Sequence, residues 1–251
     1  IQIENNIFVY PTDSRSKWLY VWDAYKIGKN VIAKSYKLKA KSWAITCQDP
    51  FESGLAGWLI SCWLKIPLQI QIHTDIFSPY FTREFLLNRL RVLLAKFLLP
   101  RADGIRVVSK RIKNSLLTFD FRLSTKITVL PIFVDIKKIQ SAEVKVDLHK
   151  KYSEYDFIIL MASRLTKEKN IGMAIEAMAE LMRKEERGKR KVLLLIVGDG
   201  PEREALQESI VNCQLSNVVI EPWTDDLFSY YKTADLFLLT SNYEGYGRTV
   251  V

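Results

Sequence analysis

The order of apolar and polar positions along the chain predicts strands and helices in regular alternation. In the first half, short apolar or alternating runs are separated by longer runs with helical spacing. The predicted strands here are Ile7–Tyr10, Trp43–Cys47, Leu68–His73, Gly104–Val108 and Ile127–Leu130, and the predicted helices are Trp18–Ala40, Phe51–Leu64, Phe85–Leu99 and Lys110–Leu117. Such alternation is typical of an α/β domain with a parallel sheet covered by helices on both faces.

A second alternating series follows a charge-rich stretch that shows no clear apolar period. Its predicted strands are Phe157–Met161, Lys191–Val197, Val218–Glu221 and Leu236–Leu239, and its predicted helices are Ile171–Lys184, Pro201–Cys213 and Leu227–Thr233. We therefore expect two α/β domains, at residues 1–135 and 156–251, joined by an interdomain connection at 136–155.

Composition narrows the class of protein. With 48% hydrophobic residues in 251, the chain can bury a substantial core. The net charge of +9 indicates an anionic partner: a phosphorylated substrate, an acidic membrane surface or nucleic acid. No nucleic-acid motif supports the third. Cys47, Cys62 and Cys213 are too scattered for a disulfide framework or a zinc site, so we interpret them as reduced core thiols of a cytosolic protein. Ile1–Asn6 lacks a basic region followed by an apolar one, so we expect no signal peptide in these residues.

Three strand ends in the second half carry candidate chemistry, because parallel sheets bind ligands beyond the carboxyl ends of their strands. At the first, Arg164 and Lys169 lie in the turn between a strand and a helix, where backbone N–H groups and the helix dipole favour an anion. Two added cations suit a diphosphate. A solvated basic loop is the alternative interpretation.

The second strand end is the segment Val197–Glu202, a tight turn into a helix. Glu202 and Glu204 in the first helical turn would repel a phosphate. We therefore expect this segment to initiate a helix, with Gly198 and Gly200 supplying a permissive backbone. It is not a dinucleotide-binding fingerprint.

The third strand end is the segment Thr240–Thr249. Gly245 and Gly247 permit a backbone that exposes consecutive N–H donors, and Glu244 places a carboxylate beside them. This pairing suits a site that holds sugar hydroxyls next to phosphate oxygens. A turn with a surface acid is the alternative.

In this order and spacing, four segments look like the donor half of the group 1 glycosyltransferases: Ser163–Asn170, Val197–Glu202, Ala234–Ser241 and Glu244–Gly247. Three segments of the first half resemble the acceptor half, namely Ile72–His73, Ala102–Ser109 and Val129–Asp135, the last with Phe133 in place of the usual glycine. The resemblance implies membership of the retaining family 4. It also implies the GT-B fold, with two Rossmann-like domains whose parallel sheets are flanked by helices.

The resemblance also assigns roles to residues. Arg164 and Lys169 would neutralise the departing nucleoside diphosphate, so no metal and no cofactor is expected, and Glu244 would bind a donor-sugar hydroxyl. His73 would contact the transferred sugar, with a structural histidine as the alternative, and Asp75 would help to position the acceptor. The remaining expected donor contacts are the glycine-rich backbone at Gly245, Tyr246 and Gly247, and the base-binding segment Pro222–Thr224 with Trp223 and Thr224.

The implied activity is retaining transfer of a hexose from a nucleotide diphosphate sugar to a glycan or a lipid-linked acceptor. A non-catalytic nucleotide- or sugar-binding module with the same fold is the alternative. The two basic helices at 85–99 and 110–117 are either core helices with a solvated basic face or a cationic surface that rests on anionic lipid, which would make the protein a peripheral one at the cytoplasmic face. The first of them is too short and too charged to span a bilayer.

The resemblance further predicts that both domains are incomplete. The family's amino-terminal strand with its glycine-rich loop has no counterpart here. The second glutamate of the family motif, eight positions after Glu244, would fall one residue beyond Val251. We therefore expect the 251-residue chain by itself to be inactive.

Overall fold

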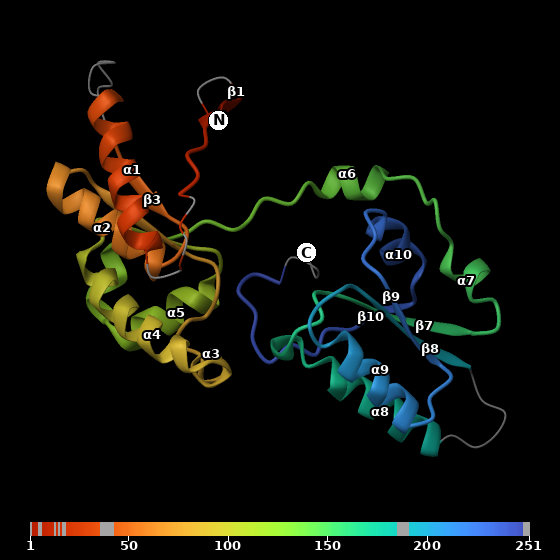
Figure 1. Cartoon of the computed structure of the whole chain (residues 1–251). Coiled ribbons are helices and arrows are strands. Elements are labelled where there is room, and N and C mark those ends of the chain that lie inside the picture. The colour runs from red at the N-terminus through yellow and green to blue at the C-terminus, as the bar shows by residue number, and fades with distance from the viewer. Residues whose placement is uncertain are drawn as a thin grey trace. The chain divides into compact units, whose positions relative to one another are not determined.

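The computed structural model describes residues 2–4, 7–12, 14, 16, 19–35, 43–184 and 191–247. The chain forms two compact units, Ile1–Ile132 and Phe133–Val251, drawn in Figure 1. The stretch 136–155, expected as a connection, is therefore grouped with the second unit. Trp18 and residues 36–40 of the first predicted helix lie outside the described residues.

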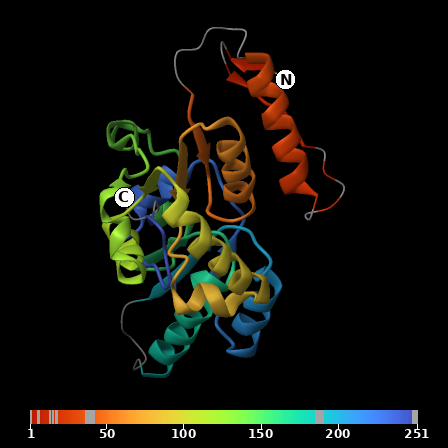
Figure 2. The same ribbon diagram turned by 90° about the vertical axis from the view of Figure 1, so that its left-hand side faces the viewer.

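The first unit is built on a parallel sheet whose strands follow one another in chain order. Its strands are β3 (Ile45–Cys47), β4 (Leu68–Ile72), β5 (Gly104–Val107) and β6 (Ile127–Val129), in the order β3-β4-β5-β6. The helices are α1 (Tyr20–Ser35), α2 (Glu52–Leu64), α3 (Pro79–Glu84), α4 (Leu86–Leu98) and α5 (Lys110–Phe119). Because right-handed crossovers between successive strands keep to one side, α2 to α5 share a face of the sheet. Helix α1 packs against α2 (Figure 2).

The two faces of this sheet differ in polarity. Alternation in β4 buries Leu68, Ile70 and Ile72 on the helix side. On the other side, the amide of Gln71 donates to Thr46 Oγ1 at 3.0 Å and accepts from Arg106 Nη1 at 2.8 Å. Within the described residues, helices thus cover only one face of this sheet, not both faces as the alternation predicted, and the other face is a hydrogen-bonded polar layer. A separate antiparallel pair, β1 (Gln2–Glu4) and β2 (Ile7–Phe8), precedes α1.

The strand order of the second unit reverses partway across its parallel sheet. The strands are β7 (Phe157–Ala162), β8 (Val192–Val197), β9 (Val218–Glu221) and β10 (Leu236–Phe237), in the order β10-β7-β8-β9. Helices α8 (Ile171–Lys184) and α9 (Arg203–Asn212) pack on one face, and α10 (Leu227–Thr233) packs on the other. The chain runs from β7 to β9 in one direction and then returns to the far side of β7. The β7/β10 boundary is therefore the switch point at which open α/β sheets bind ligands.

The charge-rich stretch before β7 contains two short helices that the sequence pattern did not predict, α6 (Ile136–Ser141) and α7 (Leu148–Lys151). Asp147 caps α7, and Leu148 is fully buried in the core beneath α10. Lys145 N donates to Ser229 Oγ of α10 at 2.9 Å. A four- or six-residue helix is too short to show an apolar period, so only tertiary contacts reveal it.

The remaining predicted elements agree with the structure to within a few residues at each end. The last predicted strand is shorter than expected, because only Leu236 and Phe237 pair with β7, although Leu238 N still donates to Leu160 O at 2.8 Å. Among the described residues, no helix combines the length and the apolar character that crossing a membrane requires.

Candidate functional site

An ion pair lies at the switch point of the second unit. The loop after β7 leads into a short 3-10 helix, Lys167–Lys169, and the loop after β10 carries Glu244. Lys169 Nζ lies 2.6 Å from Glu244 Oε1, and the two side chains are 20% and 26% exposed. Two residues that are far apart in the sequence, and that the sequence analysis assigned to one site, are thus in direct contact.

Hydrogen bonds lock the two loops around this pair. Thr240 Oγ1 donates to the carbonyl oxygens of Lys169 and Asn170, each at 2.9 Å. Ser241 Oγ donates to Glu244 Oε1 at 2.7 Å, so the carboxylate is held by two donors. The sequence analysis gave no role to Thr240 or Ser241. The sequence did contain an indication of this contact. Ser241 lies three residues before Glu244, and side chains at that spacing often form a hydrogen bond within one turn.

The glycine-rich turn after β8 supports the loop that carries Arg164. A Cβ atom at Gly198 would lie 1.9 Å from Ser163 O, and one at Gly200 would lie 2.3 Å from Leu165 O. Leu165 N donates to Asp199 O at 2.9 Å across the same contact. Helix α9 does begin directly after this turn, as expected, but the glycines have a second role: only they let the two backbones approach so closely.

The predicted base-binding segment is fixed by Asp199. Trp223 N donates to Asp199 Oδ2 at 3.0 Å, and Arg203 Nη1 donates to Asp199 Oδ1 at 2.9 Å. Thr224 Oγ1 accepts from Asp226 N at 3.2 Å. The backbone of the segment is therefore anchored, while the Trp223 side chain is 56% exposed and available to a ligand.

Among the described residues, the other predicted donor contacts form no hydrogen bond or ion pair with Lys169 or Glu244 through their side chains. Arg164 is exposed in the loop after β7, and among the described residues its side chain has no hydrogen bond or ion pair to Lys169 or Glu244. Gly247 has a φ of 70°, a left-handed conformation that favours glycine. Gly245 and Tyr246 are partly buried beside it. Arg248 and Thr249 of the same predicted segment lie outside the described residues.

His73 lies in the first unit, one residue beyond β4. Its Nε2 atom is buried and has no hydrogen-bond partner within the described residues. Burial and, to a lesser extent, the positive charge of Arg106 lower the pKa of His73 below its ordinary value of 6.5, so the imidazole is neutral near pH 7. Asp75 accepts from Ser115 Oγ at 2.7 Å. Arg106, which the sequence analysis did not single out, is the charged neighbour of the histidine.

The prediction that all three cysteines are core thiols is wrong for two of them. Cys47 is buried, and burial together with the nearby Asp49 charge raises the pKa of its thiol to about 11. Cys62 and Cys213 are exposed, so they are not the core thiols that their apolar neighbours suggested. Within the described part of the chain, no group of three or more His, Cys, Asp or Glu residues is placed to hold a metal ion.

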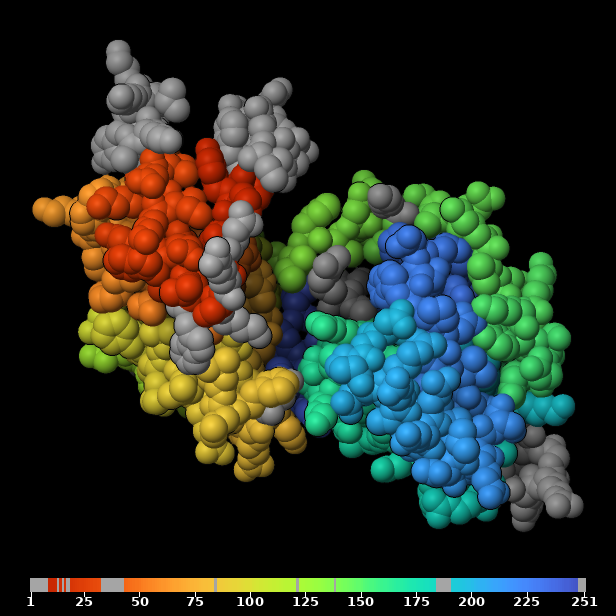
Figure 3. Space-filling view, viewed as in Figure 1, coloured from red at the N-terminus to blue at the C-terminus, as the bar shows by residue number. Residues whose placement is uncertain are grey.

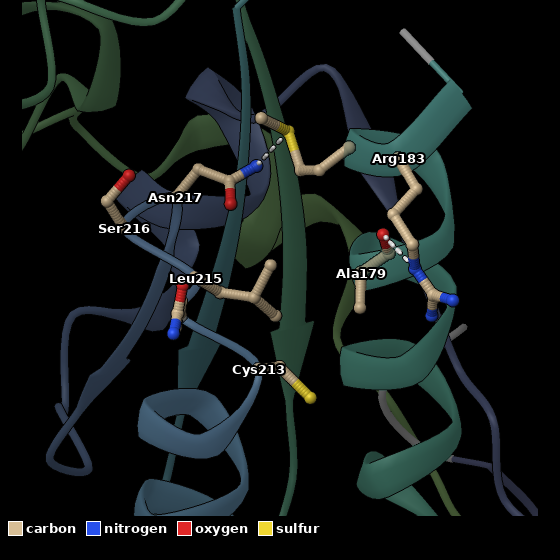
Figure 4. A pocket seen from close by; sticks show the side chains of 8 residues that line it. Ala179, Arg183, Cys213, Leu215, Ser216 and Asn217 are labelled. Atoms are coloured by element: carbon tan, nitrogen blue, oxygen red, sulfur yellow. Dashed lines mark hydrogen bonds between the residues drawn. The ribbon is translucent and has the colours of Figure 1, made fainter.

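The second unit also has a cavity of about 380 Å³ at the opposite edge of its sheet (Figure 4). Arg183 and Ala179 of α8 line one side of it, and Cys213 and Asn217 line the other. These residues precede β9 or end α8, so the cavity lies at the amino ends of the strands. It is separate from the switch point, where Lys169 and Glu244 meet.

Comparison with known proteins finds a family match within the second unit. The family model "Glycosyl transferases group 1" matches residues 146–251. The chain is 29% identical over 230 residues to the alpha-monoglucosyldiacylglycerol synthase of Streptococcus pneumoniae, covering 87% of this chain and 50% of that protein. It is 26% identical over 167 residues to the capsular polysaccharide biosynthesis glycosyltransferase CapM of Staphylococcus aureus, covering 63% of this chain and 43% of CapM. The chain thus spans about half the length of these curated relatives.

Solved structures show the same fold. The Anabaena protein HepE in complex with UDP and glucose matches with a TM-score of 0.70 at 20% identity, covering 97% of this chain and 63% of HepE. TarM matches with a TM-score of 0.66 at 18% identity, covering 91% of this chain and 41% of TarM. The two helix-flanked parallel sheets are those of the GT-B fold, as expected. The match over residues 146–251 and the named relatives together support a glycosyltransferase of the group 1 type.

Proposed function

We propose that the protein is a retaining glycosyltransferase that takes a hexose from a nucleotide diphosphate sugar bound to the second unit. The contact between Lys169 Nζ and Glu244 Oε1 at the switch point carries this proposal. It places a cation for the phosphates and an acceptor for sugar hydroxyls side by side. The similarity to a protein solved with UDP and glucose supports the choice of donor.

The spacing along the sheet edge suits a nucleoside diphosphate. Trp223 follows β9, two strands from β7, and neighbouring strands are about 4.8 Å apart, so the carboxyl ends of β7 and β9 are about 10 Å apart. A base resting against Trp223 would place its diphosphate near Lys169. Lys169 and the exposed Arg164 would then neutralise the charge that develops on the leaving group, without a metal. Glu244 would exchange its bond to Lys169 for a sugar hydroxyl.

Retention follows if the departing phosphate assists the incoming hydroxyl on the same face of the sugar. In this scheme, the protein needs no carboxylate nucleophile, and neutral His73 would serve as a hydrogen-bonding contact for the transferred sugar. A cation at that position would instead oppose the positive charge that builds on the sugar ring. The lowered pKa of His73 is consistent with this role.

The acceptor is proposed to be a glycan or a lipid-linked molecule, met at the cytoplasmic face of a membrane. Helix α4 buries Val92, Ala95 and Leu98, but its outer side is an apolar stripe that consists of Leu86, Leu90, Leu93 and Phe97, all exposed. This segment forms part of the yellow surface in Figure 3. An exposed apolar stripe on a helix of a basic protein suits partial insertion among anionic headgroups. The exposure of Leu86, Leu90 and Leu93 favours this role over core packing alone.

Calorimetry on the full-length protein with a panel of nucleotide sugars, followed by detection of the glycosylated product, tests the main proposal. Binding without turnover would favour the non-catalytic module instead. Sedimentation with anionic vesicles at low salt tests membrane contact, with Leu90→Glu expected to reduce the bound fraction. Val211→Glu, which alters an exposed apolar residue of α9, is the matched control. Equal sedimentation of both variants and the parent would refute a role for the stripe.

A further inference from the structure

The first unit has a polar cavity of about 420 Å³ at the carboxyl end of β3. Three parts of the chain line it: the segment before α1, the loop from β3 into α2, and the middle of α4. The lining residues are Thr12, Ser14, Ser16, Tyr20, Asp49, Glu52, Ser53 and Arg91. All of them are only partly exposed. No residue of this cavity has a role in the donor site described above.

Hydrogen bonds within the loop between β3 and α2 hold the Asp49 side chain in one orientation. Its Oδ1 accepts from Phe51 N at 2.8 Å, and its carbonyl oxygen accepts from Ser53 Oγ at 3.3 Å. A Cβ atom at Gly54 would lie 2.8 Å from Asp49 O, so α2 approaches this loop as closely as a glycine allows. In the described part of the chain, no hydrogen bond uses Asp49 Oδ2, which leaves an oriented carboxylate oxygen for a ligand.

Arg91 contributes a fixed donor on the opposite side. Its Nε and Nη2 donate to Glu52 Oε1 at 3.0 and 2.9 Å, and its guanidinium lies 5.6 Å from the centre of the Phe51 ring. The ion pair is about two-thirds buried, with each side chain 34% exposed. Among the described residues, neither Arg91 Nη1 nor the Tyr20 hydroxyl has a hydrogen-bond partner, so both remain available.

The charge of the lining selects the kind of ligand. Among the described lining residues, Asp49 and Glu52 against Arg91 leave one net negative charge, which disfavours a phosphate or a carboxylate. Carboxylate acceptors, hydroxyl groups and guanidinium donors together match a neutral molecule that carries many hydroxyl groups, since each hydroxyl both donates and accepts. The donor site, where cations face the ligand, has the opposite preference.

We infer that this cavity binds the neutral, hydroxyl-rich head of the acceptor, an inference that rests on the proposed glycosyltransferase function. Strand β3 is the parallel neighbour of β4, so the Asp49 loop and His73 follow adjacent strands on one edge of the sheet. Helix α4 links the cavity to the apolar stripe, because Arg91 faces inward while Leu90 and Leu93 face outward. An acceptor anchored in lipid beneath the stripe would thus present its head at the cavity.

Saturation-transfer NMR on the full-length protein, with UDP present to fill the donor site, tests the inference. Methyl α-glucoside is the neutral probe and glucose 6-phosphate the anionic one. The neutral probe is expected to bind, and Asp49→Asn or Arg91→Met is expected to weaken it about tenfold or more, the effect of one charge-assisted hydrogen bond. Asparagine still accepts from Phe51 N, so the loop is preserved. Glu176→Gln on α8, an exposed acid changed in the same way, is the control.

Calorimetry with UDP on the same variants separates this inference from the proposed function. UDP affinity unchanged in Asp49→Asn, together with weaker binding of methyl α-glucoside, supports the cavity as an acceptor subsite. Unchanged binding of the neutral probe in both variants, or stronger binding of glucose 6-phosphate than of methyl α-glucoside, overturns it. Failure of the parent protein to bind UDP counts against the donor site instead.

Discussion

Replacement of Lys169 by methionine tests whether the ion pair at the switch point is a phosphate site. In the structure, Lys169 is 20% exposed and bonds to Glu244 at 2.6 Å, so the ammonium group is held in place before any ligand arrives. Methionine has a similar length and keeps the apolar contacts of the lysine stem. The substitution therefore removes the charge and the donors, and it leaves Glu244 with Ser241 as its remaining bonded partner.

The size of the effect can be worked from these contacts. A hydrogen bond from a charged donor contributes about 1.5–3 kcal/mol. The unpaired Glu244 carboxylate near a phosphate adds repulsion of about 1 kcal/mol at a water-like dielectric. Together, about 2.5–4 kcal/mol corresponds to a Kd for UDP that is roughly 70-fold to 900-fold higher, at 1.36 kcal/mol for each factor of ten.

Isothermal titration of the full-length protein with UDP measures this change. Lys167→Met is the matched control, because Lys167 lies in the same 3-10 helix and is exposed, and its affinity for UDP should stay within about twofold of the parent's. Glu244→Gln provides the converse test: release of Lys169 should preserve UDP binding but reduce the preference for a UDP-hexose over UDP. If Lys169→Met binds UDP as well as Lys167→Met does, the site is not where we place it.

Three further predictions concern stability and pH. Gly200→Ala should cost about 1–3 kcal/mol because its Cβ would lie 2.3 Å from Leu165 O, and it should lower the Tm, whereas Gly172→Ala, with no atom within 4 Å, should not. Glu221→Gln should lower the urea midpoint of unfolding at about pH 7. Because the pKa of Glu221 in the folded protein lies below 4.5, the difference in midpoint between the variant and the parent should shrink as the pH falls through that folded-state pKa. A difference in midpoint that stays constant with pH would contradict this prediction. For His73, whose pKa is lowered, stability should fall as the pH drops below about 6.5, since the unfolded chain binds the proton first; thermal unfolding of His73→Gln should lack this slope.

Much of the second unit could be predicted from its sequence because local pattern and tertiary structure agree there. Strand β9 and helix α10 have the predicted bounds, and the run of buried residues from Leu193 to Val197 can only be a central strand. The meeting of Lys169 and Glu244 was also expected, because both follow strands of one parallel sheet. What the sequence pattern could not supply was the strand order, which alone makes the β7 and β10 loops neighbours.

The features that were missed depend on contacts between distant residues. The polar layer of the first sheet arises because Gln71 is in register with Arg106 on one neighbouring strand and reaches Thr46 diagonally on the other. The apolar stripe of α4 shows the same limit, since sequence periodicity marks a helix as amphipathic but does not tell which apolar side chains its neighbours cover. Exposure of Leu90 and Leu93 becomes visible only when α2 and the sheet are in place.

The contacts of Glu221 tie the segment where the family match begins, at residue 146, to the sheet of the second unit. Burial alone would raise the pKa of Glu221, but hydrogen bonds from Lys151, Tyr152 and Tyr230 outweigh it and lower the pKa. Lys151 and Tyr152 belong to or follow α7, so this carboxylate ties the stretch before β7 to the end of β9. Glu221 is also the residue directly before Pro222 and Trp223. Helix α7 is therefore part of the support of the proposed base-binding segment, and a chain that began at β7 would leave the largely buried Glu221 carboxylate without two of its three donors.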